Sequence, residues 1–307
     1  MRSQLIFDGI QVGAWALVPL SLVFAGLLVW GARRRRLQRG LVLLGLLVLA
    51  YAHFIEPRIL RVVRHELAIE RCLPRPAKLR IGLIADLHVG AFRNAMSLSR
   101  IRAALQAAEL DAVLIAGDFV YHLEVERFES TFRPLARMGV PVLFVLGNHD
   151  VGLPGPNVQA PLKKALERLG LIDVTHRSHV VETGTGRFEV VGISEQWQGL
   201  QRFDGVRTST AVPRLVLTHH PETLYLMPDE AQFDLLLAGH THGGQIYIPG
   251  LTCRWASFAC LVTREGGFSR PEGQGFVTAG TGMVGLPVRL GVPPRIDVLE
   301  VTADSCP

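Results

Sequence analysis

Five short blocks of polar residues each follow an apolar segment of this 307-residue chain. They contain seven side chains with metal-binding donor atoms, namely Asp86, His88, Asp118, Asn148, His219, His240 and His242. A mixed set of oxygen and nitrogen donors suits Mn, Fe or Zn better than Ca or Mg. Seven donors are too many for one ion but enough for two, with Asp118 as the natural bridging carboxylate. Two such ions favour in-line displacement at phosphorus, because they can bind the attacking and the leaving oxygen together.

The apolar segments before these blocks are predicted to be strands. They comprise residues 79–85, 112–116, 141–146, 215–218 and 235–238. Ligand sites in open α/β sheets lie just beyond the carboxyl ends of strands, so we expect the donors to converge in one crevice. Residues two apart in an extended chain point the same way, so Asp86 can pair with His88, and His240 with His242.

The remaining periodicity predicts an α/β fold that changes character along the chain. Helices are expected from a cap at Asn94 through Ala108, over residues 124–138 and over residues 160–169. Beyond residue 171 the pattern predicts further short strands at residues 180–182, 188–193, 246–248, 275–279 and 296–301. More strands than helices in the second half indicate two packed sheets with helices outside, rather than one doubly wound sheet.

The five ordered blocks resemble those of the calcineurin-like metallophosphoesterase superfamily. Residues 239–245 and 285–291 further resemble its membrane-associated or exported bacterial phosphodiesterase branch. The resemblance implies a four-layer α/β/β/α sandwich of two mixed sheets.

The resemblance also implies a role for each block. Asp86, His88 and His242 would hold one metal, while Asn148, His219 and His240 would hold the other, with Asp118 between them. A hydroxide held by both metals would attack phosphorus, and His149 would stabilise the transition state or protonate the leaving oxygen. His219 is preferred to His220 because it follows the strand at the family's position.

The chain departs from part of the superfamily. Protein phosphatases carry an aspartate and an arginine where this chain has Tyr121 and His122. This difference argues against a phosphoprotein phosphatase and leaves His149 without a known orienting partner. The expected substrate is a small or lipid-linked phosphate ester. A nucleotide diphospho-lipid pyrophosphate is an alternative substrate, disfavoured because no long capping insertion is evident, and a non-catalytic membrane scaffold that keeps its metals is the alternative from another class.

Charge and hydropathy separate the amino-terminal region from the rest. Residues 1–80 carry 13 Lys and Arg against 4 Asp and Glu, whereas residues 81–307 carry 19 against 23. The basic residues lie beside apolar runs rather than along a domain face, so a nucleic-acid partner is not expected. Residues 1–56 are predicted to form a membrane anchor with spans near 9–31 and 40–55, residues 57–77 a basic juxtamembrane linker, and residues 78–307 the catalytic domain.

The positions of the arginines predict how the chain is oriented in the membrane. Five of them between residues 33 and 39 favour a cytoplasmic loop, which would place both termini and the catalytic domain on the outer, periplasmic side. Arg58, Arg61, Arg64 and Arg71 are the counter-evidence. Oligomeric state is left open by the sequence.

The cysteines and the other histidines are not expected to bind metal. Cys72, Cys253, Cys260 and Cys306 lack metal-ligand spacing and are expected to be unpaired, with a Cys253–Cys260 disulfide as the alternative for an outward-facing domain. Isolated histidines such as His53, His65, His176 and His179 are expected at the surface or in the core. Trp197, Trp255 and Phe258 are candidates for the mouth of the site, with packing as the alternative role.

Overall fold

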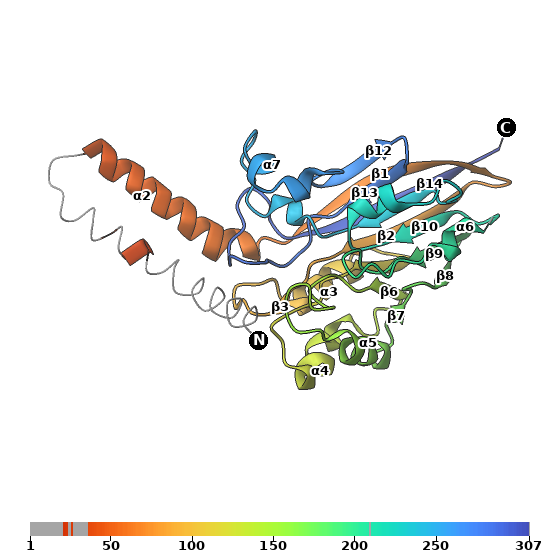
Figure 1. The fold of residues 1–307 in the computed structure, drawn as a ribbon, viewed down its shortest axis with the longest axis horizontal. Helices are drawn as coiled ribbons and strands as arrows, with labels where there is room; N and C mark the ends of the chain where they lie inside the picture. The colour runs from red at the N-terminus through yellow and green to blue at the C-terminus, as the bar shows by residue number, and fades with distance from the viewer. Residues whose placement is uncertain (1–20, 24–25, 27–35, 209, 307) are drawn as a thin grey trace.

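A computed structural model describes residues 21–23, 26, 36–208 and 210–306 (Figure 1). Most of the first predicted span, residues 9–31, and part of the arginine-rich loop lie outside these residues. The second predicted span is helical, in α2 (Arg36–Ala50), η1 (Tyr51–Ile55) and η2 (Glu56–Arg58). Within the described residues, Gly40–Arg58 is the one helix long and apolar enough to cross a membrane.

The first sheet has the strand order β1-β14-β2-β4-β6-β7. Its strands are β1 (Arg61–Leu73), β14 (Arg295–Ser305), β2 (Ala77–Ile84), β4 (Ala112–Ala116), β6 (Val142–Val145) and β7 (Ile172–Asp173). All neighbours are parallel except β14 and β2, which are antiparallel. The sheet is therefore mixed, as predicted.

The second sheet has the order β12-β13-β11-β10-β9-β8. Its strands are β12 (Gly266–Arg270), β13 (Gly273–Val277), β11 (Leu235–Ala238), β10 (Arg214–Leu217), β9 (Arg187–Gly192) and β8 (Ser178–Glu182). The inner strands are parallel, and the two edge strands are antiparallel to their neighbours. A separate pair, β3 (Val89–Gly90) and β5 (Val120–Tyr121), lies near the site.

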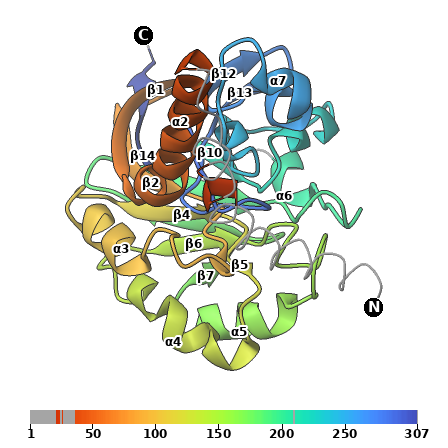
Figure 2. The same cartoon turned by 90° about the vertical axis from the view of Figure 1, so that its left-hand side faces the viewer.

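The two sheets pack face to face and are covered on the outside. Leu215 and Leu217 of β10 belong to the core between the sheets, whereas Val216 belongs to the outer core beneath α6 (Asp204–Arg207) and η5 (Pro221–Leu226). This alternation is the two-residue period of a strand buried on both faces. Helices α3 (Leu98–Gln106), α4 (Phe128–Phe132) and α5 (Gln159–Arg168) cover the first sheet (Figure 2). The predicted sandwich of two mixed sheets is confirmed.

The predicted linker is wrong, because residues 61–73 of the range 57–77 form β1. This strand pairs in parallel with β14 from Arg61 opposite Arg295 to Ile69 opposite Ala303. The charged residues on one face of this edge strand resemble the composition of an exposed linker. On the other face Val63, Leu67 and Ile69 are at least partly buried.

Three other predicted elements differ from the structure. Helix α3 begins after Ser97, whose hydroxyl accepts from Arg100 N, and not after Asn94. The helix expected over residues 124–138 is three short pieces, and the last contains Pro134, which has no N–H to continue an α-helix. The strand expected at residues 246–248 is reduced to one bridge between Ile246 and Leu290.

The cysteines are paired, contrary to the prediction. Cys72 at the end of β1 bonds to Cys306 after β14, and Cys253 bonds to Cys260. The parallel pairing of β1 with β14 brings the first pair together across 234 residues of sequence. The second pair is the disulfide considered for an outward-facing domain.

Candidate metal centre

All seven predicted donor residues lie at the carboxyl ends of strands from both sheets. Strands β2, β4 and β6 lead to Asp86 and His88, to Asp118 and to Asn148, while β10 and β11 lead to His219 and to His240 and His242. Six of these residues are buried, and His240 is half-buried. The sandwich therefore brings the residues of separate blocks into one cluster.

One group of donors contains Asp86, His88 and His242. The Nε2 atoms of the two histidines are 3.0 Å apart, and their rings stack with centroids 4.9 Å apart. The His242 Nε2 atom lies 3.6 Å from Asp86 Oδ1. Asp86 Oδ2 is buried and has no hydrogen-bond partner among the described residues.

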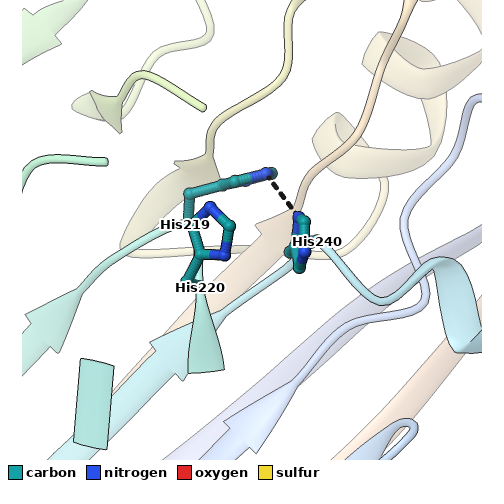
Figure 3. Close-up of side chains that lie close together, drawn as sticks. All are labelled: His219, His220 and His240. Atoms are coloured by element: carbon teal, nitrogen blue, oxygen red, sulfur yellow. Dashed lines mark hydrogen bonds between the residues drawn. The ribbon is translucent and has the colours of Figure 1, made fainter. Parts of the chain in front are cut away.

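A second group contains Asn148, His219 and His240. His219 Nδ1 donates to the carbonyl oxygen of Ala116 at 2.7 Å, which leaves the Nε2 lone pair as the atom that could bind a metal. This Nε2 lies 2.9 Å from Asn148 Oδ1 and 3.3 Å from His240 Nδ1. The Asn148 amide is oriented by its own Nδ2, which donates to Leu153 O at 2.6 Å. Figure 3 shows His219 and His240 facing one another from the ends of adjacent strands.

Asp118 lies between the two groups. Its Oδ2 is 3.3 Å from His88 Nε2 and 3.3 Å from His219 Nε2, one residue of each group. Its Oδ1 accepts from His149 N at 2.9 Å, which fixes the direction of the carboxylate. A single carboxylate oxygen thus faces the donors of both groups.

The donor sets fit divalent metal ions. Ligand atoms bound about 2.0–2.2 Å from an ion lie roughly 3–3.6 Å apart, which is the spacing found within both groups. The two facing Nε2 atoms of His88 and His242 cannot be satisfied by each other if both are unprotonated. A cation between them would satisfy both nitrogens, and Asp86 Oδ1 lies 3.6 Å from His242 Nε2 as a third ligand atom.

Unusual backbone conformations accompany these donors. Asp86, His88, Asp118, His240 and His242 all have positive φ angles, between 43° and 70°. Residues other than glycine rarely adopt this region, and each such residue costs about 1–3 kcal/mol, so these angles cluster at functional sites. The fold stabilises five strained residues in one place, and all five are predicted ligands.

Asp150 holds two of the ligand loops together. Its carboxylate accepts from Phe119 N and Val120 N in one loop, at 2.9 and 3.1 Å, and from Gly147 N in the other at 3.0 Å. Gly147 is required at this crossing, because a Cβ atom there would lie 2.1 Å from Asp118 Oδ1. Burial raises the pKa of Asp150 to about 7, and the three N–H donors oppose this rise.

The motif at residues 285–291 also stabilises the backbone next to the donor residues. Arg289 is fully buried and donates to three backbone carbonyls, those of Gly282, Val292 and Ala279. Gly282 N in turn donates to Asp86 O at 2.6 Å. The motif therefore helps to fix the position of the Asp86 backbone.

Burial and mutual charge shift the pKa values in the site strongly. Burial raises the pKa of Asp86 to about 7 and lowers the pKa of His88 to about 3. Burial is also the largest single effect on His219, but the charge and hydrogen bond of Asp118 together with Asp86 and the Ala116 carbonyl outweigh it and raise the pKa of His219 to about 10. The same burial disfavours the charged form of Asp118, yet His219, His149 and His88 hold its pKa well below the usual range. The raised pKa values of Asp86 and His219 show that the site favours added positive charge.

His149 lies beside the donor groups. Its ring is in edge-on contact with the rings of Tyr121 and His88, with centroids 5.1 and 4.9 Å away. The backbone carbonyl of Pro154 is its hydrogen-bonding partner, and burial lowers the pKa of His149 overall. A main-chain carbonyl and an aromatic ring therefore orient His149, where protein phosphatases were expected to use a carboxylate.

A buried pair next to the site was missed by the sequence reasoning. His220 Nε2 lies 2.9 Å from Glu195 Oε1, and the ring of His220 lies 3.9 Å from that of His240 (Figure 3). Glu195 also accepts from Trp197 N at 2.6 Å, and the Trp197 ring contacts both His220 and His240. The available signal was that Glu195 follows the end of a predicted strand, like the predicted ligands.

Three of the other histidines have partners elsewhere. His53 Nδ1 bonds to Pro287 O, His65 Nε2 to Asp297 and His176 Nε2 to Ser194.

Comparison with known proteins gives a consistent result. Residues 79–244 match the sequence profile described as calcineurin-like phosphoesterase. The chain is 32% identical over 202 residues to phosphodiesterase YaeI of Escherichia coli, covering 65% of this chain and 73% of the relative. It is 28% identical over 250 residues to a Danio rerio transmembrane protein with metallophosphoesterase domain, covering 75% and 54%. It is 23% identical over 270 residues to the UDP-2,3-diacylglucosamine pyrophosphatase LpxG of Chlamydia muridarum, covering 72% and 80%.

Proposed function

Because the chain belongs to the calcineurin-like phosphoesterase family, it is a phosphoric ester hydrolase, and we propose that it works with two divalent metal ions held by the seven donors. Asp86, His88 and His242 would hold one ion, Asn148, His219 and His240 would hold the other, and the Asp118 carboxylate would serve both. The observation that carries this proposal is the position of Asp118 Oδ2, 3.3 Å from a histidine nitrogen of each group. The donor chemistry favours Mn, Fe or Zn.

The chain's own residues have defined tasks in the proposed reaction. When bound, the two ions supply Lewis-acid polarisation of the phosphoryl group and lower the pKa of the attacking water. His149 delivers a proton to the leaving oxygen, since its imidazole lies beside the donors and its own backbone N–H fixes Asp118. Asp150 and Arg289 keep the donor loops in place.

The proposed substrate is a phosphodiester or phosphomonoester, small or lipid-linked. Similarity to a protein named phosphodiesterase supports a diester. A nucleotide diphospho-lipid pyrophosphate is the second candidate, supported by the similarity to LpxG. A non-catalytic scaffold is disfavoured, because the chain belongs to a phosphoesterase family and carries all seven donor residues.

We also propose that the chain is anchored in a membrane with its catalytic domain on the outer side. The helix Gly40–Arg58 and the similarity to a transmembrane protein support anchoring. The two disulfides support the outer side, because disulfides persist in oxidising compartments such as the periplasm.

The orientation can be tested with a reporter fused after Pro307. A periplasmic phosphatase fused there should be active, and a fluorescent protein that folds only in the cytoplasm should be dark. Maleimide labelling of the denatured full chain should detect free thiols only after reduction. The opposite reporter pattern, together with four free thiols before reduction, would place the domain in the cytoplasm.

Activity is tested on the full chain purified in detergent and stripped of metal. Bis-p-nitrophenyl phosphate, p-nitrophenyl phosphate and a pyrophosphate diester should be compared with added Mn, Fe or Zn. Metal-dependent hydrolysis of at least one substrate, lost in Asp118→Asn, is the expected result. Metal binding without turnover of any of the three would support the scaffold instead.

A further inference from the structure

An exposed apolar segment lies beside the metal centre. We define the apolar segment as residues 248–261, which include α7 (Thr252–Trp255) and η7 (Ser257–Cys260). Its exposed side chains are Ile248, Leu251, Trp255, Phe258 and Leu261, between 39% and 57% accessible. Monomeric soluble domains seldom gather so many large apolar side chains on one short stretch, and such patches mark interaction sites.

The apolar segment is held rigidly in this exposed arrangement. The Cys253–Cys260 disulfide closes it at the middle. Thr252 is buried, and its hydroxyl donates to Ile246 O and accepts from Ile248 N. Ala256 and Ala259 are also buried, so the small residues face the domain while the large ones face outward. The alternation of small and large residues therefore keeps the large apolar side chains exposed to solvent.

The apolar segment borders the entrance to the site. The Phe258 ring lies 5.9 Å from the ring of His240, a proposed ligand. Trp197, 54% exposed, contacts His240 at 5.3 Å from another loop. A hydrocarbon chain in contact with Phe258 would therefore lie next to a proposed metal ligand, His240.

The membrane helix fixes which end of the domain faces the bilayer. At its base, Asn94 Nδ2 donates to His53 O, Arg289 N donates to Ala52 O, and Glu56 accepts from Val292 N at 2.7 Å. No flexible linker follows, because β1 begins at Arg61. In Figures 1 and 2 the apolar segment, marked by α7, lies at the same end of the domain as α2.

We propose that the apolar segment inserts into the interface of the membrane that holds α2, and that the site takes a phosphate ester carried by a lipid of that leaflet. This inference rests on the proposed phosphoesterase function and narrows its substrate class. Trp255 suits the interfacial region, where an amphipathic ring is favoured, and the exposed Arg254 can reach anionic headgroups. The apolar face of α2, including Leu41, Leu44 and Leu47, is exposed at the same end.

Insertion can be measured through Trp255. The full chain carrying Trp15→Phe, Trp30→Phe and Trp197→Phe retains Trp255 as its single tryptophan. Reconstituted in vesicles of brominated phosphatidylcholine, it should lose most of its emission relative to unbrominated vesicles. A matched control replaces all four tryptophans by phenylalanine and adds Val125→Trp, on the helical layer near α4, where emission should persist. Equal emission of Trp255 in both lipids would overturn the insertion.

Substrate presentation can be measured with two esters that share a leaving group. One is methyl p-nitrophenyl phosphate in solution, and the other is a diacylglycerol p-nitrophenyl phosphate within phosphatidylcholine vesicles. In the variant Leu251→Ser/Trp255→Ser/Leu261→Ser, hydrolysis of the lipid ester should fall about tenfold, while hydrolysis of the soluble ester stays within about twofold. Val125→Ser should change neither rate.

The outcomes separate the inference from the proposed function. Equal loss on both esters, or no loss on the lipid ester, would overturn lipid presentation while leaving the phosphoesterase intact. Failure of the unmutated chain to hydrolyse either ester with added metal would count against the proposed function. Quenching of Trp255 would still decide whether the apolar segment meets the bilayer.

Discussion

The role of Asp150 as a tie between two ligand loops predicts the effect of one exchange. Asp150→Asn keeps the size of the side chain but turns one oxygen into an NH2 group. With the remaining oxygen on Phe119 N and Val120 N, the NH2 group faces Gly147 N–H, so one hydrogen bond is lost and two become neutral. Hydrogen bonds to charged groups contribute about 1.5–3 kcal/mol and neutral ones about 0.5–1.5 kcal/mol.

The expected change in stability follows from these values and from the pKa of Asp150. Burial raises this pKa from 3.8 to about 7 despite the three bonds, so the ionised carboxylate costs the folded state about 4 kcal/mol at pH 8. The amide avoids this cost but leaves Gly147 N–H unpaired at about 1–3 kcal/mol, so the variant should be more stable by about 2 kcal/mol. At about 2–4 °C per kcal/mol for a domain of this size, Tm should rise by about 4–8 °C. The measurement is thermal unfolding of the full chain in detergent at pH 8, above the pKa of about 7, where Asp150 is ionised.

Asp111→Asn is the matched control. Asp111 accepts a single backbone bond, from Arg80 N at 2.7 Å, and an asparagine oxygen can keep that bond. Its Tm should fall by less than about 4 °C, which corresponds to about 1 kcal/mol. Equal shifts in the two variants would refute the reasoning, because the relief of the buried charge of Asp150 would then have no effect on stability.

Three further predictions concern the metal centre. Asp118→Asn should lose both ions by elemental analysis, whereas His176→Ala should retain them; two ions per chain in the first variant would reject the bridging role. The variant His149→Ala should keep its metals, but its rate of hydrolysis should fall about 10²–10⁴-fold with alkyl esters and much less with nitrophenyl esters. Equal losses of rate with both kinds of ester would exclude proton donation. The affinity for metal should decrease as the pH is lowered. Binding of metal displaces a proton from His219 below about pH 10 and a proton from Asp86 below about pH 7. Calorimetric titration should show a slope of about one log unit per pH unit for each ion, below about pH 10 at the site of His219 and below about pH 7 at the site of Asp86, and a flat profile would contradict this displacement.

The clustering of the seven predicted donors could be anticipated from the sequence because of how short parallel strands end. Each ligand block directly follows a run such as Ala112–Ala116 or Leu235–Ala238, and both of these strands have the predicted bounds. Backbone pairing then brings the ends together regardless of the distance along the chain. His219 was distinguished from His220 by its family position, and its Nε2 does face Asn148 in the structure.

Features that depend on distant partners could not be predicted in the same way. Nothing near Cys72 indicates Cys306, since their proximity arises only from the pairing of β1 with β14. The same pairing makes a strand of residues whose charges resemble a linker. Asn94 has the residue type of a helix cap, but its amide instead donates to His53 O and Pro287 O at the base of α2. Tertiary contacts overrode local preference in each case.

The position of β14 between β1 and β2 has a consequence for biosynthesis. Its two neighbours are the earliest strands of the domain, and β14 is reached only after the whole second sheet has been translated. Until then β1 and β2 each present an open edge where β14 will insert, and open edges invite pairing with other chains. We therefore expect nascent chains stopped before Arg295 to aggregate or be degraded while attached to the membrane.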